Sequence, residues 1–179
     1  MFKFLYNLFF NRSQFKLGET TEPIKPEFSS IPNNHGETFM KIYITVEDIL
    51  TSSGKYPERA KDAECNDTVK SNAAKLCDKV NNLFTDLKYQ GKLSVNSGFR
   101  TTGVNKSIPN AAKKSLHMSG QAVDFSDPEG KIDALLFDDK NDHLLKKYGL
   151  WLEHPDATRY WSHCDMKDRG ARSKNVFKP

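Results

Sequence analysis

The most regular pattern in the chain is a run of apolar residues spaced by four and three positions in alternation. Asn66 and Asp67 stand just before this run and can cap a helix, while Gln90 and Gly91 can end one. Such spacing puts the apolar side chains on one face of a helix that packs against a core. The pattern predicts a long amphipathic helix, with a buried face made of Val69, Ala73, Leu76, Val80, Leu83 and Leu87.

Shorter patterns on both sides of this helix predict small elements. Before it, the alternating segment KIYITVEDIL at 41–50 turns into a helical start at Val46. After it, KLSVNSGF at 92–99 alternates as a short strand that runs into Arg100. The following segment, TTGVNKSIPNAAKK at 101–114, is rich in turn residues and predicts a loop.

The second half of the domain predicts a small antiparallel sheet with short helices between its strands. In QAVDF at 121–125, the alternation turns Val123 and Phe125 toward the core and Asp124 toward the other face. Residues 150–153 and 160–166 predict two strands joined by a loop that contains proline. One or two short helices are predicted by the apolar residues Ile132, Leu135, Leu136, Leu144 and Leu145. Helices followed by a small antiparallel sheet indicate the α+β class.

Residues 1–39 differ from the rest and are interpreted as an N-terminal extension or arm, with the compact domain at 40–179. The start MFKFLYNLFFNR is apolar for too few residues to span a bilayer, and no small-residue cleavage site follows it. Residues 15–39 contain prolines and glycines among polar residues and lack an apolar period. We interpret the start as a docking segment; a poor signal peptide and a membrane-surface helix are the alternatives.

Composition and charge argue for a single globular domain and against a nucleic-acid partner. The chain has 179 residues, 37% of them hydrophobic, which is enough for one domain with its own core. Its net charge of +4 is spread along the sequence and forms no basic block, so no nucleic-acid partner is expected. A mildly basic surface would suit a polyanionic partner such as a bacterial cell wall, although charge alone does not select it.

The three cysteines, Cys65, Cys77 and Cys164, are odd in number and lack paired spacing. They predict neither a disulfide framework nor a cysteine-based zinc site, and they favour synthesis in a reducing compartment. On a strand, Cys164 would share a face with Ser162 and point away from His163, so we expect it in the core.

Histidines and an aspartate supply candidate metal ligands. In SLHMSGQAVD at 115–124, His117 precedes a tight turn at Gly120, and Ala122 leaves room beside Asp124. Both side chains can therefore face one point, and His163 in YWSHCDM can join them from another strand. Histidine nitrogen and carboxylate oxygen suit zinc. His35 and His143 lie in polar segments and are expected to be solvated.

Three motifs in this order resemble the zinc D-Ala-D-Ala carboxypeptidase family, whose relatives include phage endolysin peptidases and the hedgehog signalling domain. They are SGFR at 97–100, S-x-H-x-x-G-x-A-x-D at 115–124 and W-x-H at 161–163. SGFR alone is weak, but the ten-residue motif is fairly specific and the ordered set is strong. The resemblance covers about residues 41–170 and implies an α+β fold of the hedgehog and D-Ala-D-Ala peptidase type, with a zinc site at the sheet face.

By this resemblance, His117, Asp124 and His163 would bind Zn²⁺ and leave one position for water, as catalytic zinc sites do. Arg100 would bind a substrate carboxylate or stabilise the oxyanion. Ser115 would stand in the substrate site as a loop-capping or supporting hydroxyl, since no triad-like base is recognisable for it.

The general base is where the sequence departs from the family, because many relatives carry an acid three residues before the last histidine and Tyr160 stands there. Glu153 is the first choice, since a hairpin could set it across from His163, although a pair with Arg159 is an alternative. The other candidates for the base are His154, Asp156 and Asp165. If none reaches the water, the domain would bind zinc without turnover.

The resemblance implies a zinc metallopeptidase that hydrolyses D-Ala-containing peptide bonds of bacterial peptidoglycan, as a carboxypeptidase or an endopeptidase. We expect a phage-encoded enzyme, made in the bacterial cytoplasm, that acts on the cell wall after release or as part of a phage particle. The alternative is a virion component with weak or no turnover, which contacts other virion proteins through residues 1–39. No transmembrane segment is expected.

Overall fold

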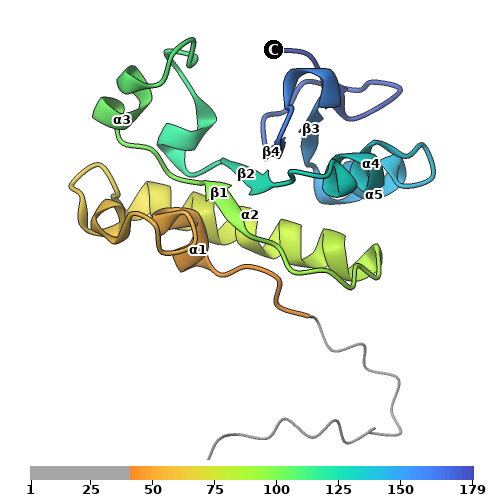
Figure 1. Ribbon diagram of the computed structural model, residues 1–179, viewed down its shortest axis with the longest axis horizontal. Helices are drawn as coiled ribbons and strands as arrows, with labels where there is room; N and C mark the ends of the chain where they lie inside the picture. Colours follow the sequence, from red (N-terminus) through yellow and green to blue (C-terminus); the bar gives the residue numbers. More distant parts are fainter. Residues whose placement is uncertain (1–40) are drawn as a thin grey trace, which may run out of the picture. The chain divides into compact units, whose positions relative to one another are not determined.

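The computed structural model describes residues 41–179, which form a small sheet with helices packed against it (Figure 1). The α-helices of this part are α1 (Val46–Thr51), α2 (Asp67–Asp86), α3 (Thr102–Ser107), α4 (Lys131–Phe137) and α5 (Asp142–Tyr148). The 3₁₀ turns are η1 (Pro57–Lys61), η2 (Leu116–Ser119) and η3 (Pro155–Ala157). The strands are β1 (Val95–Ser97), β2 (Ala122–Ser126), β3 (Trp151–Glu153), β4 (Trp161–Asp165) and β5 (Val176–Phe177). The predicted α+β class is confirmed.

The predicted amphipathic helix is α2. The Asn66 side chain accepts a hydrogen bond from the backbone N–H of Val69, which caps the helix start as expected. The helix ends at Asp86, earlier than the Gln90-Gly91 pair. Its apolar face lies against the sheet, where the ring of Phe84 meets that of Phe125 edge-on, with centroids 5.7 Å apart. In Figure 1, α1 and α2 lie together on this side of the sheet.

The sheet has the strand order β1-β2-β4-β3-β5 and is mixed. The pairs β1–β2, β2–β4 and β3–β4 are antiparallel, as predicted, but β5 pairs with β3 in parallel. The expectation of a purely antiparallel sheet is therefore wrong at this edge. Strand β5 has only two residues, too few for a sequence pattern to indicate a strand. Long-range hydrogen bonds hold it in the sheet, and in one of them the N–H of His154 donates to the carbonyl of Phe177 at 2.8 Å.

Strands β2 and β4 present one face to the hydrophobic core and the other to the candidate site. Val123, Phe125 and Cys164 are fully buried in the hydrophobic core on the side of α2, as expected from the alternation. Asp124 and His163 lie on the opposite face. This alternation means that the sheet can hold polar ligands on one face without placing charge in the core.

The predicted loop at 101–114 contains a short helix, α3. The Thr101 side chain accepts from the backbone N–H of Val104, and the distant Glu64 carboxylate accepts from both the N–H and the hydroxyl of Thr102. The prediction failed because Thr, Gly, Asn and Ser have weak helix propensity. Contacts with a residue far away in sequence stabilise the first turn instead.

The proposed arm at 1–39 and its boundary with the domain at 40–179 lie largely outside the described residues and stay predictions. Of the helices in residues 41–179, none is both long enough and apolar enough to cross a membrane. His143 is exposed, as expected.

The segment from Ser97 to Arg100 is bound closely to the end of α1. The N–H of Phe99 donates to the carbonyl of Ile49 at 2.8 Å, and the N–H of Gly98 donates to the Ser52 hydroxyl at 3.2 Å. A Cβ at Gly98 would lie only 1.9 Å from the Ile49 carbonyl oxygen. Only glycine lets the two backbones approach this closely.

We predict that Gly98→Ala lowers the free energy of unfolding by about 2–4 kcal/mol, because the backbone must move apart to admit the methyl group. Gly103→Ala is the matched control, since no atom lies within 4 Å of its added Cβ and it sits in α3. Helix propensity should make that change neutral or stabilising by up to about 1 kcal/mol. Urea unfolding of both variants measures the difference, and equal effects would contradict the packing argument.

Candidate metal centre

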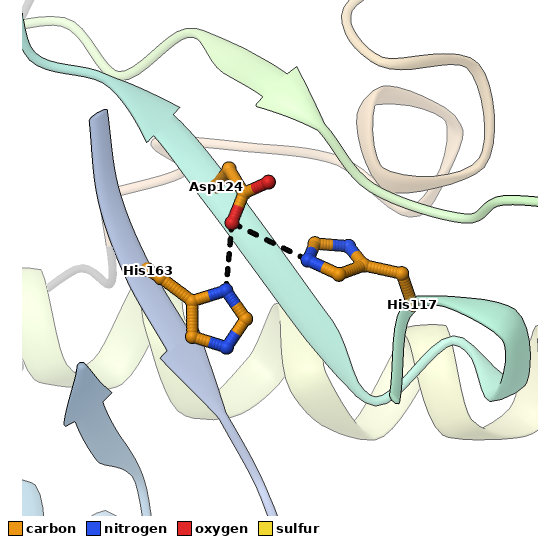
Figure 2. A group of neighbouring side chains, drawn as sticks. All are labelled: His117, Asp124 and His163. Atoms are coloured by element: carbon orange, nitrogen blue, oxygen red, sulfur yellow. Dashed lines mark hydrogen bonds and ion pairs between the residues drawn. The ribbon is translucent and has the colours of Figure 1, made fainter. Parts of the chain in front are cut away.

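Three side chains converge above the sheet: His117 from η2, Asp124 from β2 and His163 from β4 (Figure 2). The strand register places Asp124 directly opposite His163. The Asp124 Oδ1 atom lies 2.7 Å from His163 Nδ1 and 3.3 Å from His117 Nε2. One donor atom from each residue lies within 4.8 Å of the others. The structure thus brings together the three residues that the sequence singled out as ligands.

The ring of His117 is held in one orientation by the backbone of the 97–100 segment. Its Nδ1 lies 2.8 Å from the carbonyl oxygen of Gly98. Because a carbonyl can only accept, Nδ1 carries a proton and donates, and Nε2 is the ring nitrogen turned toward Asp124. A hydrogen bond of this kind is the usual support for a metal-binding histidine. The left-handed backbone of Gly120 turns the chain from η2 back into β2.

Arg100 lies against Asp124. Its Nη2 donates to Asp124 Oδ2 at 2.7 Å, while its Nε donates to the Ser97 hydroxyl at 2.8 Å. Oδ2 of the carboxylate is therefore fixed by a cation, and Oδ1 is turned toward the two histidines. Arg100 is expected from the sequence to bind substrate, and in the structure it also positions Asp124 by a contact that the sequence did not show.

A second ion pair supports His163 from its other side. Asp165 Oδ2 lies 3.4 Å from His163 Nε2, and both oxygens of Asp165 accept from Arg169, at 2.6 and 2.7 Å. The Arg169 guanidinium also stacks over the ring of Phe177, 3.6 Å from its centroid. Sequence reasoning missed Arg169. Its spacing of four residues from Asp165 was the available signal, but the segment that carries both is not a helix.

Glu153 is the general-base candidate that lines the cleft with no hydrogen bond or ion pair holding its carboxylate among residues 41–179. It lies one position beyond the pair Leu152↔Cys164, which sets it across from His163, and it lines the same cleft. Burial raises the pKa of its carboxyl group, and the nearby His163 opposes this rise in part. Among residues 41–179, Glu153 forms no ion pair with Arg159, so that alternative is not seen.

The remaining base candidates are less well placed. Asp165 lines the cleft, but Arg169 holds both of its oxygens. His154 and Asp156 pair with each other, and the ring of His154 packs on that of Phe137. Neither of them lines the cleft. Tyr160, at the position where many relatives carry an acid, also lies outside the cleft and is 58% exposed.

The centre opens into a cleft of about 1000 Å³. Ser115 and Trp161 line it, together with Arg100 and the three candidate ligands. Ser115 precedes η2, and its hydroxyl forms no cap hydrogen bond there. Trp151 is buried, in contrast to Trp161. A cleft of this size is large enough for several residues of a peptide.

The pKa of each of the three side chains depends on the other members of the group. Burial disfavours the charged form of His163, but its hydrogen bonds to Asp124 and Asp165 outweigh this and raise its pKa to about 9. Burial also disfavours the Asp124 carboxylate, yet the two histidines hold its pKa well below its usual range. For His117, burial lowers the pKa, and Asp124 opposes this in part.

These shifts make the stability of the metal-free protein depend on pH. Charged His163 stabilises the fold below the pKa of about 6.5 that the unfolded chain has, and this stabilisation is lost as pH rises toward about 9. Two imidazole nitrogens and one ionised carboxylate are donors that zinc prefers. The residues present therefore fit a zinc ion, which would replace the proton of His163.

Comparison with known proteins assigns a family to most of the described domain. A family model described as Peptidase M15 matches residues 43–151. The matched segment contains Arg100, His117 and Asp124 and ends before Glu153 and His163. A search of curated proteins gave no match.

We predict that zinc binding to the metal-free protein releases about one proton at pH 7. His163 is the source, since its pKa of about 9 keeps it charged at this pH and a zinc ligand must be neutral. Calorimetric titration with zinc in buffers of different ionisation enthalpy measures the release. Asp156→Asn is the control and should leave the value unchanged, because Asp156 pairs with His154 outside the cleft. Zinc binding without proton release would contradict this account.

Proposed function

We propose, from the premise that the chain belongs to the peptidase M15 family, that it is a zinc-dependent peptidase of peptidoglycan. Its substrates would be D-Ala-containing peptide bonds of the stem peptides, cut at a chain end or within a cross-link. The observation that carries the proposal is the convergence of His117, Asp124 and His163 at the floor of an open cleft.

His117 Nε2, His163 Nδ1 and the Asp124 carboxylate would hold the zinc ion. When bound, zinc supplies Lewis-acid chemistry: it polarises a peptide carbonyl and lowers the pKa of a water molecule. The chain contributes rigidity, because each ligand is fixed by a further partner. The Gly98 carbonyl fixes His117, and Arg100 fixes Asp124. Fixed ligands keep the cost of reorganisation during reaction low.

Glu153 would act as the general base. Its carboxylate takes a proton from the attacking water and delivers it to the leaving nitrogen when the peptide bond breaks. Its position across from His163 gives it access to the centre. Burial, which raises its pKa, makes the carboxylate a better proton acceptor than an exposed one.

Arg100 would contribute to binding as well as to positioning. Its Nη2 and Nε donate to Asp124 and Ser97, but its Nη1 makes no hydrogen bond among the described residues, and the side chain lines the cleft. Nη1 is therefore available to donate to the oxygen of the scissile carbonyl as negative charge develops on it. Ser115, on the same wall, can donate a hydroxyl to the peptide.

We predict that zinc-loaded native protein releases peptide fragments from purified peptidoglycan and that Glu153→Gln lowers kcat by about 10²–10⁴-fold. The amide keeps the shape of the side chain but cannot accept the proton. Asp156→Asn serves as the matched control and should keep native activity, since Asp156 lies outside the cleft. Mass spectrometry of the released fragments names the bond. Native protein that holds one zinc ion yet releases nothing would contradict the proposed activity and leave a zinc-bearing binding domain.

The place of action is also a proposal: the cell wall, reached after release from the cell or as part of a phage particle. The apolar start of residues 1–39 and the segment interrupted by Pro23, Pro26 and Pro32 that follows it support an anchoring role. We predict that deletion of residues 1–39 leaves hydrolysis unchanged and abolishes incorporation into particles, measured by assay and by immunoblot of purified particles. Loss of zinc binding or of folding on deletion would show instead that the segment belongs to the catalytic unit.

A further inference from the structure

Arg59 is a buried cation at the wall of the cleft. Its side chain comes from η1, lines the same cleft as the candidate metal ligands and is only 8% exposed. The ring of Tyr56 covers one face of its guanidinium, 3.8 Å from the ring centroid to Cζ. Tyr56 also lines the cleft.

The protein satisfies this guanidinium only in part. Both of its hydrogen bonds come from Nη1, at 3.2 Å to the carbonyl of Phe99 and 3.4 Å to the hydroxyl of Ser52. Nε is buried without a partner. Nη2 makes no hydrogen bond within residues 41–179 and is not among the buried unpartnered atoms, so it keeps some exposure on a side chain that lines the cleft.

Arg59 also lacks a counterion, unlike the two other arginines of the cleft. Asp124 neutralises Arg100, and Asp165 neutralises Arg169. No carboxylate in the described part of the chain lies within ion-pair distance of Arg59; its neighbour Glu58 is exposed. A buried charge is costly unless an opposite charge compensates it. A cation kept without one at a binding cleft fits an anionic group that arrives with the ligand.

The position of Arg59 relates it to the reaction centre. Its partner Phe99 lies between Gly98, whose carbonyl holds His117, and Arg100, which holds Asp124. One short segment therefore positions two of the three candidate metal ligands and also this cation. A peptide with its scissile bond at the centre would carry its neighbouring groups along this wall.

We propose that Arg59, stacked on Tyr56, forms an anion subsite that binds a free carboxylate of the peptide substrate. The inference rests on the proposed function and deepens it, because it makes the enzyme selective for acidic stem peptides over amidated ones. Two carboxylates of a stem peptide share this chemistry: the C-terminal carboxylate and the α-carboxylate of a γ-linked glutamate. Arginine N–H groups that meet a carboxylate form strong, charge-assisted hydrogen bonds.

The test uses three forms of one stem pentapeptide, L-Ala-γ-D-Glu-L-Lys-D-Ala-D-Ala. One has both carboxylates free, one has a C-terminal amide, and one has the α-carboxylate of glutamate amidated. The zinc-loaded full chain is compared with Arg59→Gln, Arg59→Lys and the matched control Arg159→Gln. Arg159 is exposed and lies outside the cleft, so its loss removes the same charge elsewhere.

For each peptide, kcat/KM is measured where fragments are released, and Kd is measured by calorimetry. The preference is the ratio of kcat/KM, or of affinity, between the acid form and an amidated form. We expect native protein and Arg159→Gln to prefer a free acid by about ten- to hundredfold, and Arg59→Gln to lose this preference. Arg59→Lys should keep part of it. The amidated form that binds poorly to native protein identifies which carboxylate is bound.

The ratio separates a binding role from a structural one, because partial unfolding of Arg59→Gln would weaken acid and amide alike. If Arg59→Gln does not fold, Tyr56→Leu removes the stacked ring and should also reduce the preference. A native protein without preference, or variants that keep it, would overturn the inference. Native protein that prefers the acid but cuts nothing would instead refute the proposed activity and leave the subsite standing.

Discussion

The pairing of β2 with β4 is the interaction on which the site depends. Its register sets Asp124 opposite His163 and buries Val123, Phe125 and Cys164 on the other face. Because side chains alternate along a strand, a slip of one residue would turn the apolar set toward the cleft and the ligands toward α2. The cost of burying Asp124 without partners therefore acts together with the hydrophobic core to fix the register.

The four residues of SGFR at 97–100 join this sheet to the rest of the centre. Ser97 accepts from Arg100, Gly98 lets the segment touch α1 and holds His117, and Phe99 fills the core and accepts from Arg59. The motif is weak as a sequence signal because each residue type is common. In the structure, however, its four residues position a candidate metal ligand, the partner of another candidate ligand and a cation of the cleft.

Sequence alone predicted the elements whose signal is local or strongly periodic. The helix α2 was predicted because apolar residues alternate between spacings of four and three from Val69 to Leu87, and the face of Cys164 followed from alternation in β4. The grouping of the three candidate ligands was expected from the motif in which two of them lie. Arg169 was missed because a spacing of four residues indicates contact only in a helix, and the segment that carries Asp165 and Arg169 is not one. Arg59 and strand β5 were missed because their partners lie far away in the sequence, and α3 because Glu64 supports its first turn from a distance. Long-range contacts of this kind leave no period in the sequence.

The central claim is that His117, Asp124 and His163 hold one zinc ion at the cleft. Anomalous diffraction at the zinc absorption edge, from crystals of the full chain grown with one equivalent of zinc, tests it most directly. The account predicts a single strong peak enclosed by the two imidazole rings and the Asp124 carboxylate, and no peak in His117→Ala crystals. A peak at another place, ligation by cysteine sulfur, or no ordered zinc at all would contradict it.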